Sequence, residues 1–294
     1  MISETAFIGL GRMGLPMTRR LAAAGIAVRG YDLSEKARSS LDVIDGARAA
    51  ASAADAARGC GAVILMLPTS DAVEAVLLDD GLLDALEPPM VLIDMGSSEP
   101  LRTRALAERA AAREIEMLDA PVSGGVPGAV AGTLTIMVGG AGEAFEECRP
   151  MFEAMGGNVR HVGGAGAGHA LKALNNLLSA VHLLASCEAL AVAERFGLDP
   201  GVFVDVVNTS SGRSGSTDNK LPNYVIPGRF DSGFTMGLMV KDMTIAVSLG
   251  EDLGLASELG ESALDAWRRA VAALSDDADH TEISRWLALA EERA

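Results

Sequence analysis

The stretch "TAFIGLGRMGLPMTRRLAAAG" (residues 5–25) decides the fold. A short β-prone run, "TAFIGL", leads into a glycine-rich turn, and we expect the helical segment that follows to end at Gly25. A second strand, "IAVRGYD" (26–32), comes directly after it. Between a strand and a helix, the pattern GxGxxG is typical of a dinucleotide-binding βαβ unit. The residues of the turn are Gly9, Leu10, Gly11, Arg12, Met13 and Gly14.

Each glycine of this pattern has a physical reason. Gly9 permits the tight turn, Gly11 lets the backbone approach a pyrophosphate, and Gly14 allows the helix to pack closely on the strand. The N-terminus of the helix then presents free N–H groups and the positive end of the helix dipole to the phosphates. The alternative is an ordinary strand–helix turn.

Asp32 ends the second strand, where an acidic residue usually accepts hydrogen bonds from the adenosine ribose hydroxyls of the cofactor. A carboxylate at this position repels the additional phosphate of NADP, and Arg29 is poorly placed to compensate. We therefore expect NAD rather than NADP as the cofactor. Asp32 could instead be a plain N-cap of the helix that follows in "LSEKA" (33–37).

Apolar runs of strand length recur through the first half of the chain. They are "AVILMLP" (62–68), "MVLIDMG" (90–96), "IEMLDAPV" (115–122) and "GTLTIMVGG" (132–140), with a helical segment at 101–114. Continuous apolar runs suit strands that are buried on both faces of a parallel sheet. Strands that alternate with helices predict an α/β, Rossmann-type doubly wound parallel sheet.

The second half of the chain has a different pattern, in which strand signals fade. Long Ala/Leu-rich segments predict helices over 165–197, 199–209, 235–253 and 256–273. We therefore expect a NAD-binding Rossmann domain over residues 1–164 and a smaller all-α substrate and oligomerisation domain over residues 165–294. The glycine-rich "HVGGAGAGH" (161–169) is the expected junction. The polar stretch 210–223 predicts a long loop, either lining the cleft or serving as a solvated connector, and Asp279 is expected to begin a helix.

Composition excludes several classes of protein. The chain has 294 residues, of which 49% are hydrophobic, and 24 basic against 40 acidic residues give a net charge of −16. We expect no nucleic-acid partner, because such a partner needs a clustered basic face. No signal peptide, no apolar stretch of about 20 residues and no metal-ligand spacing stand out, so we expect no membrane partner and no metal. Three widely spaced cysteines predict reduced, buried thiols in a cytoplasmic protein.

Two further motifs carry polar groups that suit a small acid substrate. Ser123, Gly124 and Gly125 follow a predicted strand and offer a hydroxyl and uncrowded N–H groups, which can form a nest for a carboxylate. The alternative is a flexible turn. In "GHALKALNN" (168–176), Lys172 and Asn176 are four residues apart, so they are neighbours on one face of an otherwise apolar helix.

Five blocks of the sequence together resemble the β-hydroxyacid dehydrogenases, the 3-hydroxyisobutyrate dehydrogenase group. They are "FIGLGRMGLPM" (7–17), "MLPTS" (66–70), "DAPVSGG" (119–125), "GHALKALNN" (168–176) and "LMVKDM" (238–243), in the family's order and spacing. The resemblance covers essentially the whole chain. It implies a Rossmann domain followed by an all-α domain, and a homodimer or homotetramer.

The resemblance also implies a role for each motif. Lys172 would be the catalytic acid/base, and Asn176, with its neighbour Asn175, would bind the substrate. Ser123, Gly124 and Gly125 would hold the substrate carboxylate. Leu67, Pro68 and Ser97 would line the cofactor, and Lys241 would close over cofactor and substrate.

Two positions depart from the family's pattern. His169 stands where the family commonly has Gln, three residues before Lys172, and Gly96 replaces a more usual Ser in "DMGSSEP" (94–100). His169 could add pH sensitivity near neutrality. We expect instead that it only takes over the hydrogen bonds of the amide.

These observations predict a reversible NAD-linked oxidation of a small 3-hydroxy acid to the semialdehyde or keto acid. Oxidation removes a proton from the hydroxyl, and Lys172 would accept it once burial beside a cationic nicotinamide has lowered its pKa from about 10.4. One alternative is a reductase of small semialdehydes, such as tartronate or succinic semialdehyde. An alternative of another class is a non-catalytic nucleotide-binding interaction module, which the lysine disfavours.

Overall fold

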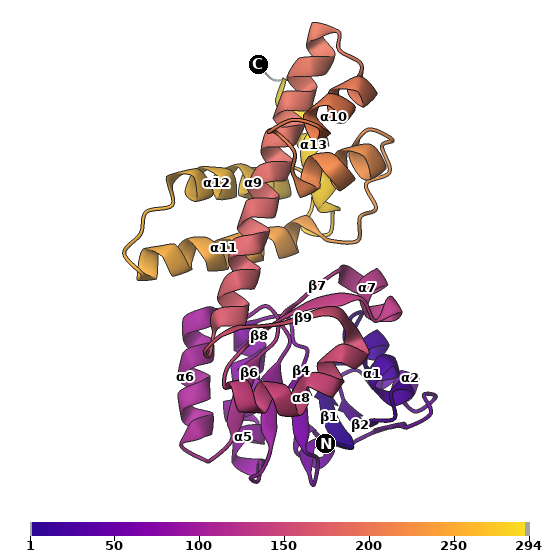
Figure 1. The fold of residues 1–294 in the computed structure, drawn as a ribbon, viewed down its shortest axis with the longest axis vertical. Coiled ribbons are helices and arrows are strands. Elements are labelled where there is room, and N and C mark those ends of the chain that lie inside the picture. Colours follow the sequence, from indigo (N-terminus) through magenta and orange to yellow (C-terminus); the bar gives the residue numbers. More distant parts are fainter. Residues whose placement is uncertain (1, 292–294) are drawn as a thin grey trace. The chain divides into compact units, whose positions relative to one another are not determined.

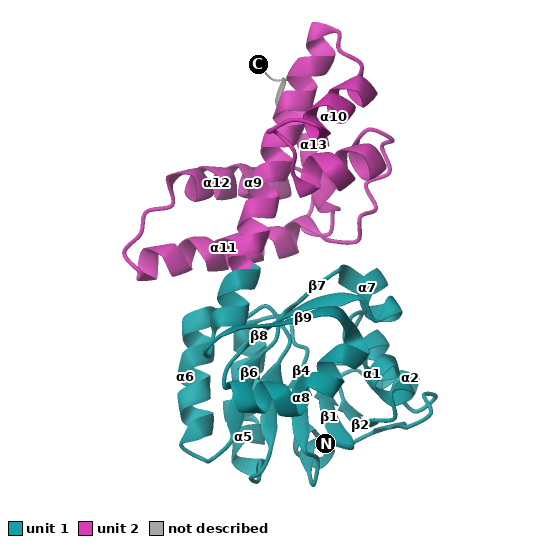
Figure 2. Cartoon of the chain, in the orientation of Figure 1, with its two compact units in different colours: residues 1–172 teal, residues 173–294 magenta. Residues whose placement is uncertain are grey.

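The computed structural model describes residues 2–291 (Figure 1), and the chain divides into two compact units (Figure 2). Unit 1 comprises Met1–Lys172 and unit 2 comprises Ala173–Ala294. The division falls inside helix α9 (Ala167–Phe196), whereas the boundary expected at 164/165 lies just before that helix.

Unit 1 is built on a nine-stranded sheet in the order β3-β2-β1-β4-β5-β6-β8-β7, with β9 paired to β8. The strands are β1 (Glu4–Ile8), β2 (Ala27–Tyr31), β3 (Ala47–Ala49), β4 (Ala62–Leu65), β5 (Val91–Asp94), β6 (Glu116–Asp119), β7 (Val122–Ser123), β8 (Leu134–Gly139) and β9 (Gly156–Gly163). Neighbouring strands from β3 to β6 are parallel, as the apolar runs predicted.

The expectation of a wholly parallel sheet is wrong at β8. This strand pairs antiparallel with both β6 and β7, so that Asp119 faces Gly139 and Ser123 faces Thr135. The chain from β6 through β7 turns back through one short helix, α7 (Gly125–Ala131), and β8 therefore returns alongside the segment it has just left. The result is a Rossmann-like sheet with a mixed edge.

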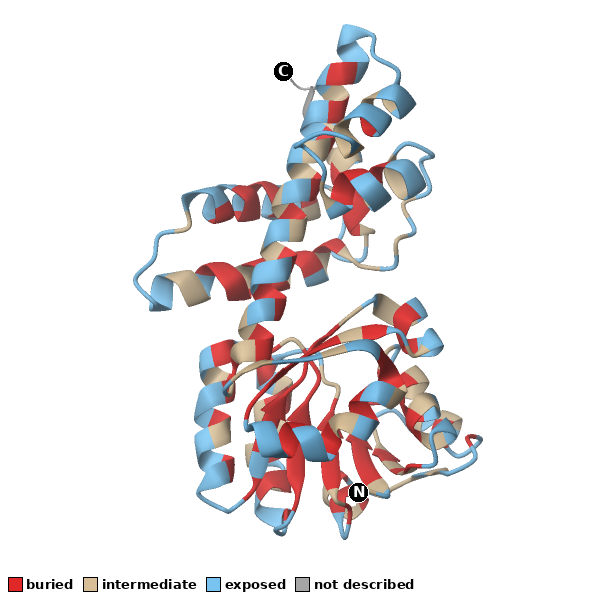
Figure 3. Cartoon of the chain, in the orientation of Figure 1, coloured by how far each residue is buried: buried red, intermediate tan, exposed pale blue. Residues whose placement is uncertain are grey.

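Helices cover both faces of this sheet. On one face lie α1 (Gly14–Ala23), α2 (Glu35–Leu41), α7 and α8 (Gly142–Met155), whose buried side chains join Phe7, Ile64 and Ile93 in one core. On the other lie α3 (Ala53–Ala57), α4 (Ser70–Glu74), η1 (Ala75–Asp79), α5 (Leu82–Ala85) and α6 (Pro100–Ala111), packed on Ile8, Val63 and Leu65. Figure 3 shows the central strands as buried, and burial on both faces explains their unbroken apolar sequence.

Unit 2 is built of helices. They are the greater part of α9, α10 (Pro200–Asn208), η2 (Ser216–Val225), α11 (Met236–Asp252), α12 (Glu258–Ala273), η3 (His280–Glu282) and α13 (Ile283–Glu291). The core surrounds Trp267, which is fully buried and donates a hydrogen bond from Nε1 to the carbonyl oxygen of Ala180 at 3.3 Å. The expected all-α second domain is confirmed.

The polar stretch 210–223 is not the long loop that its composition predicted. Residues Ser216–Val225 form a helix with wide, π-type turns, and Ser216, Thr217 and Leu221 are buried. Leu221 packs in the core of unit 2 and anchors this segment, whose other residues are mostly polar. Asp279, by contrast, begins η3 as expected, because its carboxylate accepts a hydrogen bond from the N–H of Thr281 at 3.0 Å.

Helix α9 is long and strongly apolar. By length and composition alone its 30 residues are sufficient to cross a membrane, with a mean hydropathy of 1.5 over the most apolar 18-residue window. Ala180, Leu183, Cys187 and Leu190 of this helix are buried in the core of unit 2. The core of unit 2 thus accounts for the apolar character of one face. The three cysteines, Cys60, Cys148 and Cys187, are buried and free, as expected.

His280 is a buried histidine that makes the stability of unit 2 depend on pH. Burial, reinforced by Lys220, lowers the pKa of His280 to about 4, although Asp279 opposes the shift. The unfolded chain binds a proton at this imidazole near pH 6.5 and the folded chain only near pH 4, so stability falls as the pH drops through this window. The lowered pKa corresponds to roughly 3.5 kcal/mol, at about 1.4 kcal/mol for each pKa unit.

Wild type should lose stability between pH 7 and pH 4.5. We expect His280→Asn to lose much less stability over the same range. Asparagine retains a polar group near the position of Nδ1, which lies 3.0 Å from both Ser232 Oγ and the carbonyl oxygen of Phe234, but it does not titrate. Urea unfolding at the two pH values measures the difference, and His182→Asn at an exposed position of α9 is the control. An equal loss of stability in wild type and His280→Asn would refute this origin of the pH dependence.

Candidate active site

The glycine-rich turn after β1 is shaped for a phosphate group. Gly9 has φ +98°, and a Cβ on it would overlap the carbonyl oxygen of Met66. A Cβ on Gly14 would overlap the carbonyl oxygen of Gly9, whereas a Cβ on Gly11 would meet no atom within 4 Å in the described part of the chain. Two glycines are therefore required by packing, and the third leaves the space a pyrophosphate would take above the start of α1.

Asp32 lies just beyond β2, next to this turn. Its carboxylate accepts hydrogen bonds from the N–H groups of Leu10, at 2.7 Å, and Ser34, at 2.8 Å. The N-cap of α2 is Ser34, which accepts from the N–H of Ala37, so Asp32 does not take the plain capping role. Arg29 forms an ion pair with Glu4 at 2.7 Å and is already neutralised there.

The loops after β4 and β5 reach the same sheet edge as the glycine-rich turn, because β1, β4 and β5 are parallel neighbours. Leu67 and Pro68 follow β4, and Ser97 follows β5. The two loops are tied together, since Ser70 Oγ accepts a hydrogen bond from the N–H of Glu99 at 2.8 Å. In open α/β sheets this edge, outside the carboxyl ends of the strands, is where ligands bind.

Gly96 has a steric reason to differ from the serine usual in the family. A Cβ at this position would lie 2.7 Å from the carbonyl oxygen of Leu67 and 3.1 Å from Asp94 Oδ1. A serine side chain would therefore force the two loops apart. The loops after β4 and β5 approach so closely in this chain that only glycine fits at position 96.

Ser123 ends β7, Gly124 is the N-cap of α7, and Gly125 is the first residue of that helix. Gly124 has φ +128° and Gly125 has φ +59°, which are conformations that favour glycine. Ser123 is half-buried at the end of its strand. Successive N–H groups in such a turn can converge on an anion, so the carboxylate nest stays a prediction.

Lys172 and Asn176 lie on successive turns of α9, and each is only 7% exposed. The burial of Lys172 excludes an ordinary surface lysine. Asn176 Nδ2 donates a hydrogen bond to Asp242 Oδ2 at 2.6 Å, and its Oδ1 accepts one from Asn175 Nδ2 at 3.1 Å. These bonds fix which way the Asn176 amide faces.

Asp242 on α11 contacts the predicted site residue Asn176, and the sequence alone did not point to it. It is 2% exposed, and Lys241 Nζ lies 3.4 Å from its Oδ1. The block "LMVKDM" contained it, but nothing in the spacing connected it with Asn176, which is distant in sequence. Of the remaining predicted residues, unit 1 holds the cofactor motif, the serine–glycine turn and Lys172, and unit 2 holds Asn175, Asn176 and Lys241.

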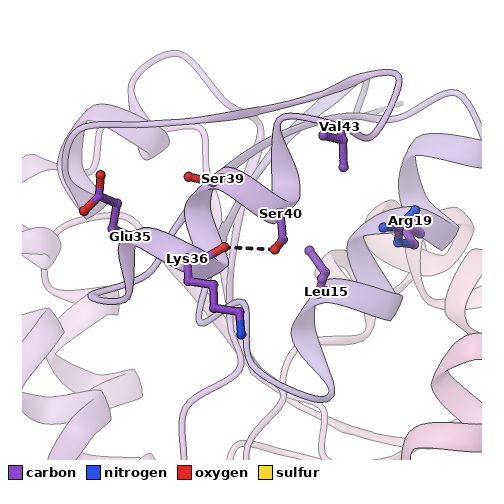
Figure 4. A pocket seen from close by; sticks show the side chains of 7 residues that line it. All are labelled: Leu15, Arg19, Glu35, Lys36, Ser39, Ser40 and Val43. Carbon is purple, nitrogen blue, oxygen red and sulfur yellow. Dashed lines mark hydrogen bonds between the residues drawn. The ribbon is translucent and has the colours of Figure 1, made fainter.

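A surface cavity of about 690 Å³ lies elsewhere in unit 1, between α1 and α2 (Figure 4). It is lined by Leu15, Arg19, Glu35, Lys36, Ser39, Ser40 and Val43. None of these is a predicted site residue. The cavity has mixed charges and no buried polar group directed into it among its lining residues, so it supplies no argument about function.

The sheet order and the glycine-rich turn define a Rossmann-type domain that binds a dinucleotide, here followed by an all-helical domain. Residues 4–163 match the family model described as the NAD binding domain of 6-phosphogluconate dehydrogenase. Residues 166–287 match the model described as "NAD-binding of NADP-dependent 3-hydroxyisobutyrate dehydrogenase". The chain belongs to the β-hydroxyacid dehydrogenase family, in the 3-hydroxyisobutyrate dehydrogenase group, which confirms the resemblance of its sequence blocks.

The chain is similar along most of its length to two curated relatives and one solved structure. The chain is 40% identical over 274 residues to the NAD-dependent L-serine dehydrogenase of Pseudomonas aeruginosa, covering 91% of this chain and 92% of the relative. It is 40% identical over 266 residues to the 3-hydroxyisobutyrate dehydrogenase of the same organism, covering 88% and 89%. A solved structure of 3-hydroxyisobutyrate dehydrogenase from Mycobacterium tuberculosis, with L-serine, superposes with a TM-score of 0.92 at 34% identity, covering 98% and 99%. The protein is therefore an NAD(P)-dependent dehydrogenase of 3-hydroxy acids.

Proposed function

We propose that the protein oxidises a small 3-hydroxy acid, of the 3-hydroxyisobutyrate or L-serine type, with NAD, and that Lys172 is the general acid/base. The observation that carries the proposal is the buried pair of Lys172 and Asn176 on successive turns of α9. The two relatives with 40% identity are named for these two substrates, and both compounds are 3-hydroxy carboxylates.

The roles of the residues follow from their chemistry. The nicotinamide, when bound, accepts the hydride that leaves carbon. Lys172 Nζ accepts the hydroxyl proton in oxidation and returns it in reduction. Asn176 does not titrate, and its amide is held by Asp242, so it can orient the hydroxyl without competing for the proton. The Ser123–Gly125 turn binds the carboxylate.

The position of Asp32 supports NAD rather than NADP. Its carboxylate is fixed beside the glycine-rich turn by two backbone N–H groups, where it would repel a ribose phosphate. Arg29 is paired with Glu4, and Arg38 Nη1 donates to the carbonyl oxygens of Asp32 and Leu33 at 2.6 and 3.2 Å. Neither arginine is therefore directed toward the position of a ribose phosphate, where its charge would attract NADP.

We expect kcat/KM with NAD to exceed that with NADP at least tenfold, and Asp32→Ser to reduce the preference by a similar factor. Steady-state kinetics with 3-hydroxyisobutyrate and with L-serine measure both. Asp45→Ser, at an exposed position after α2, is the matched control and should leave the ratio unchanged. A wild-type kcat/KM that favours NADP would refute the cofactor assignment, and inactivity with both acids would refute the substrate class.

We also propose that the protein is a homodimer or homotetramer. Large apolar side chains of unit 2 lie on its surface, including Leu178 and Phe196 of α9 and Val202 and Val206 of α10. Such exposure suits contact with a second copy of the chain. A light-scattering mass equal to one chain would contradict it.

A further inference from the structure

Arg102, on the first turn of α6, contacts three carboxylates, which come from α4 and from the N-cap of α6. Its Nε donates to Glu74 Oε1 at 2.8 Å, and its Nη2 lies 2.7 Å from Asp71 Oδ1, both on α4. Its Nη1 donates to Oε1 of the N-cap residue Glu99 at 3.0 Å. One guanidinium group therefore joins α4 to the start of α6.

The ion pairs of Arg102 with α4 differ in strength because they differ in exposure. The side chains of Arg102 and Glu74 are 30% and 33% exposed, whereas that of Asp71 is 84% exposed. An exposed ion pair contributes little free energy, because water and salt screen it. The hydrogen bond from Arg102 also holds the pKa of Glu74 below its usual value, so this carboxylate is ionised at neutral pH. The pair of Arg102 and Glu74 is therefore the stronger link to α4.

The same carboxylates would repel one another without the guanidinium group. Asp71 and Glu74 lie on α4, and Glu99 lies at the start of α6. Helix α4 has only five residues, so its position depends on its contacts with neighbouring elements. Loss of Arg102 would therefore replace an attraction between the two helices by a repulsion.

The two helices begin directly after the loops that contain Leu67, Pro68 and Ser97. The N–H of Glu99 donates to Ser70 Oγ at 2.8 Å, which links the ends of these loops. Arg102 adds ion pairs to this link one turn further into the helices. The separation of the loops therefore depends on how Arg102 holds α4 and α6 together.

The order of the strands predicts which half of the cofactor these loops would meet. Asp32 follows β2, on one side of β1 and its glycine-rich turn, whereas β4 and β5 lie on the other side. A dinucleotide binds across the point where the strand order reverses, with its pyrophosphate on the glycine-rich turn. With the adenosine ribose beside Asp32, the nicotinamide half extends over the loops after β4 and β5.

We propose that Arg102 is a positioning residue for the nicotinamide half of the cofactor. By joining α4 to α6, it fixes the separation at which the loops with Leu67, Pro68 and Ser97 receive the nicotinamide ring and its ribose. The adenosine half would rest on the glycine-rich turn and Asp32, whose hydrogen bonds do not involve Arg102. The inference rests on the proposed placement of NAD at this edge of the sheet.

The test compares NADH with ADP-ribose, which lacks the nicotinamide. We expect Arg102→Met to weaken NADH binding roughly fivefold or more, and to leave ADP-ribose binding within about twofold of wild type. Glu74→Ala should weaken NADH binding about threefold or more, again without an effect on ADP-ribose. Asp71→Asn should bind both ligands as wild type does, because its ion pair is exposed. Isothermal titration calorimetry at about 0.1 M salt measures each affinity.

The matched control is Arg113→Met. Arg113 lies just beyond the other end of α6 and forms an ion pair with Asp84 at 2.9 Å, so its replacement should leave both affinities unchanged. The double variant Arg102→Met/Glu74→Ala should bind NADH no more weakly than Arg102→Met, because both changes remove the same contact. Losses that add would mean that the two residues act independently, which would contradict the inference.

NADH binding by Arg102→Met within about twofold of wild type would overturn the inference. An equal loss of NADH and ADP-ribose binding would also overturn it, because that result indicates a general disturbance of the cofactor domain. If Arg102→Met does not fold, the same comparison with Glu74→Ala decides. If wild type binds NADPH more tightly than NADH, the proposed cofactor is wrong, and NADPH with 2′-phospho-ADP-ribose decides the role of Arg102 in the same way.

Discussion

Lys172→Ala is expected to lower kcat at least 100-fold while leaving NADH binding nearly unchanged. The proton of the substrate hydroxyl has to leave as the hydride leaves carbon, and general acid–base catalysis by one side chain typically contributes a factor of 10² to 10⁴. Lys172 is buried on the same face of α9 as Asn176, so its replacement would be a water molecule, which is a weaker base and has no fixed position. Steady-state kinetics and fluorescence titration of NADH separate turnover from binding.

The matched control for this variant is Lys36→Ala. Lys36 is an exposed lysine of α2 and borders only the surface cavity of unit 1. We expect its replacement to leave kcat with NAD at the wild-type value. Lys172→Ala with a kcat within a few-fold of wild type would remove the lysine from the mechanism.

The second large effect is expected from the glycines of the cofactor turn. Substituting them one at a time distinguishes the glycine needed for packing from the one needed for cofactor binding. Gly14→Ala places a Cβ against the carbonyl oxygen of Gly9, and neither backbone can easily move away. We expect a loss of about 2–3 kcal/mol in the free energy of unfolding of the cofactor-free protein, as is usual when a packed site receives an extra methyl group.

Gly11→Ala is the matched comparison. Its Cβ meets no atom within 4 Å in the described part of the chain, so the cofactor-free stability should remain close to wild type. The same methyl group would occupy space needed by the pyrophosphate, and we expect at least tenfold weaker NADH binding. Chemical denaturation and NADH titration measure the two effects. If Gly11→Ala binds NADH as tightly as wild type, the phosphate does not sit on this turn.

The fold was largely predictable because its signals are local. A strand followed by GxGxxG and an apolar helix leaves little choice of structure, and strands buried on both faces must be apolar throughout, as "AVILMLP" is. The reversal at β8 was not predictable in this way. Its apolar sequence suits a parallel or an antiparallel neighbour equally well, and the direction is set by where the α7 turn sends the chain.

Contacts between distant segments account for what the sequence left undetermined at the site. Lys172 and Asn176 could be paired because they are one helical turn apart. Asp242 holds Asn176 from a different helix, and Asp119 caps α9 from the end of a strand, so no spacing rule connects either pair. His169 showed itself as a departure from the family's pattern, but the carboxylate that faces its Nε2 became evident only in three dimensions.

Rescue of Lys172→Ala by small amines tests most directly whether the lysine nitrogen carries the substrate proton. Methylamine or ethylamine, added with NAD and the 3-hydroxy acid that wild type oxidises, can enter the space left by the side chain and accept the proton. We predict that the rate of NADH formation by Lys172→Ala rises in proportion to the concentration of unprotonated amine, while the wild-type rate does not change. A Lys172→Ala enzyme that remains fast without amine, or a slow one whose rate no amine increases, would contradict the role assigned to Lys172.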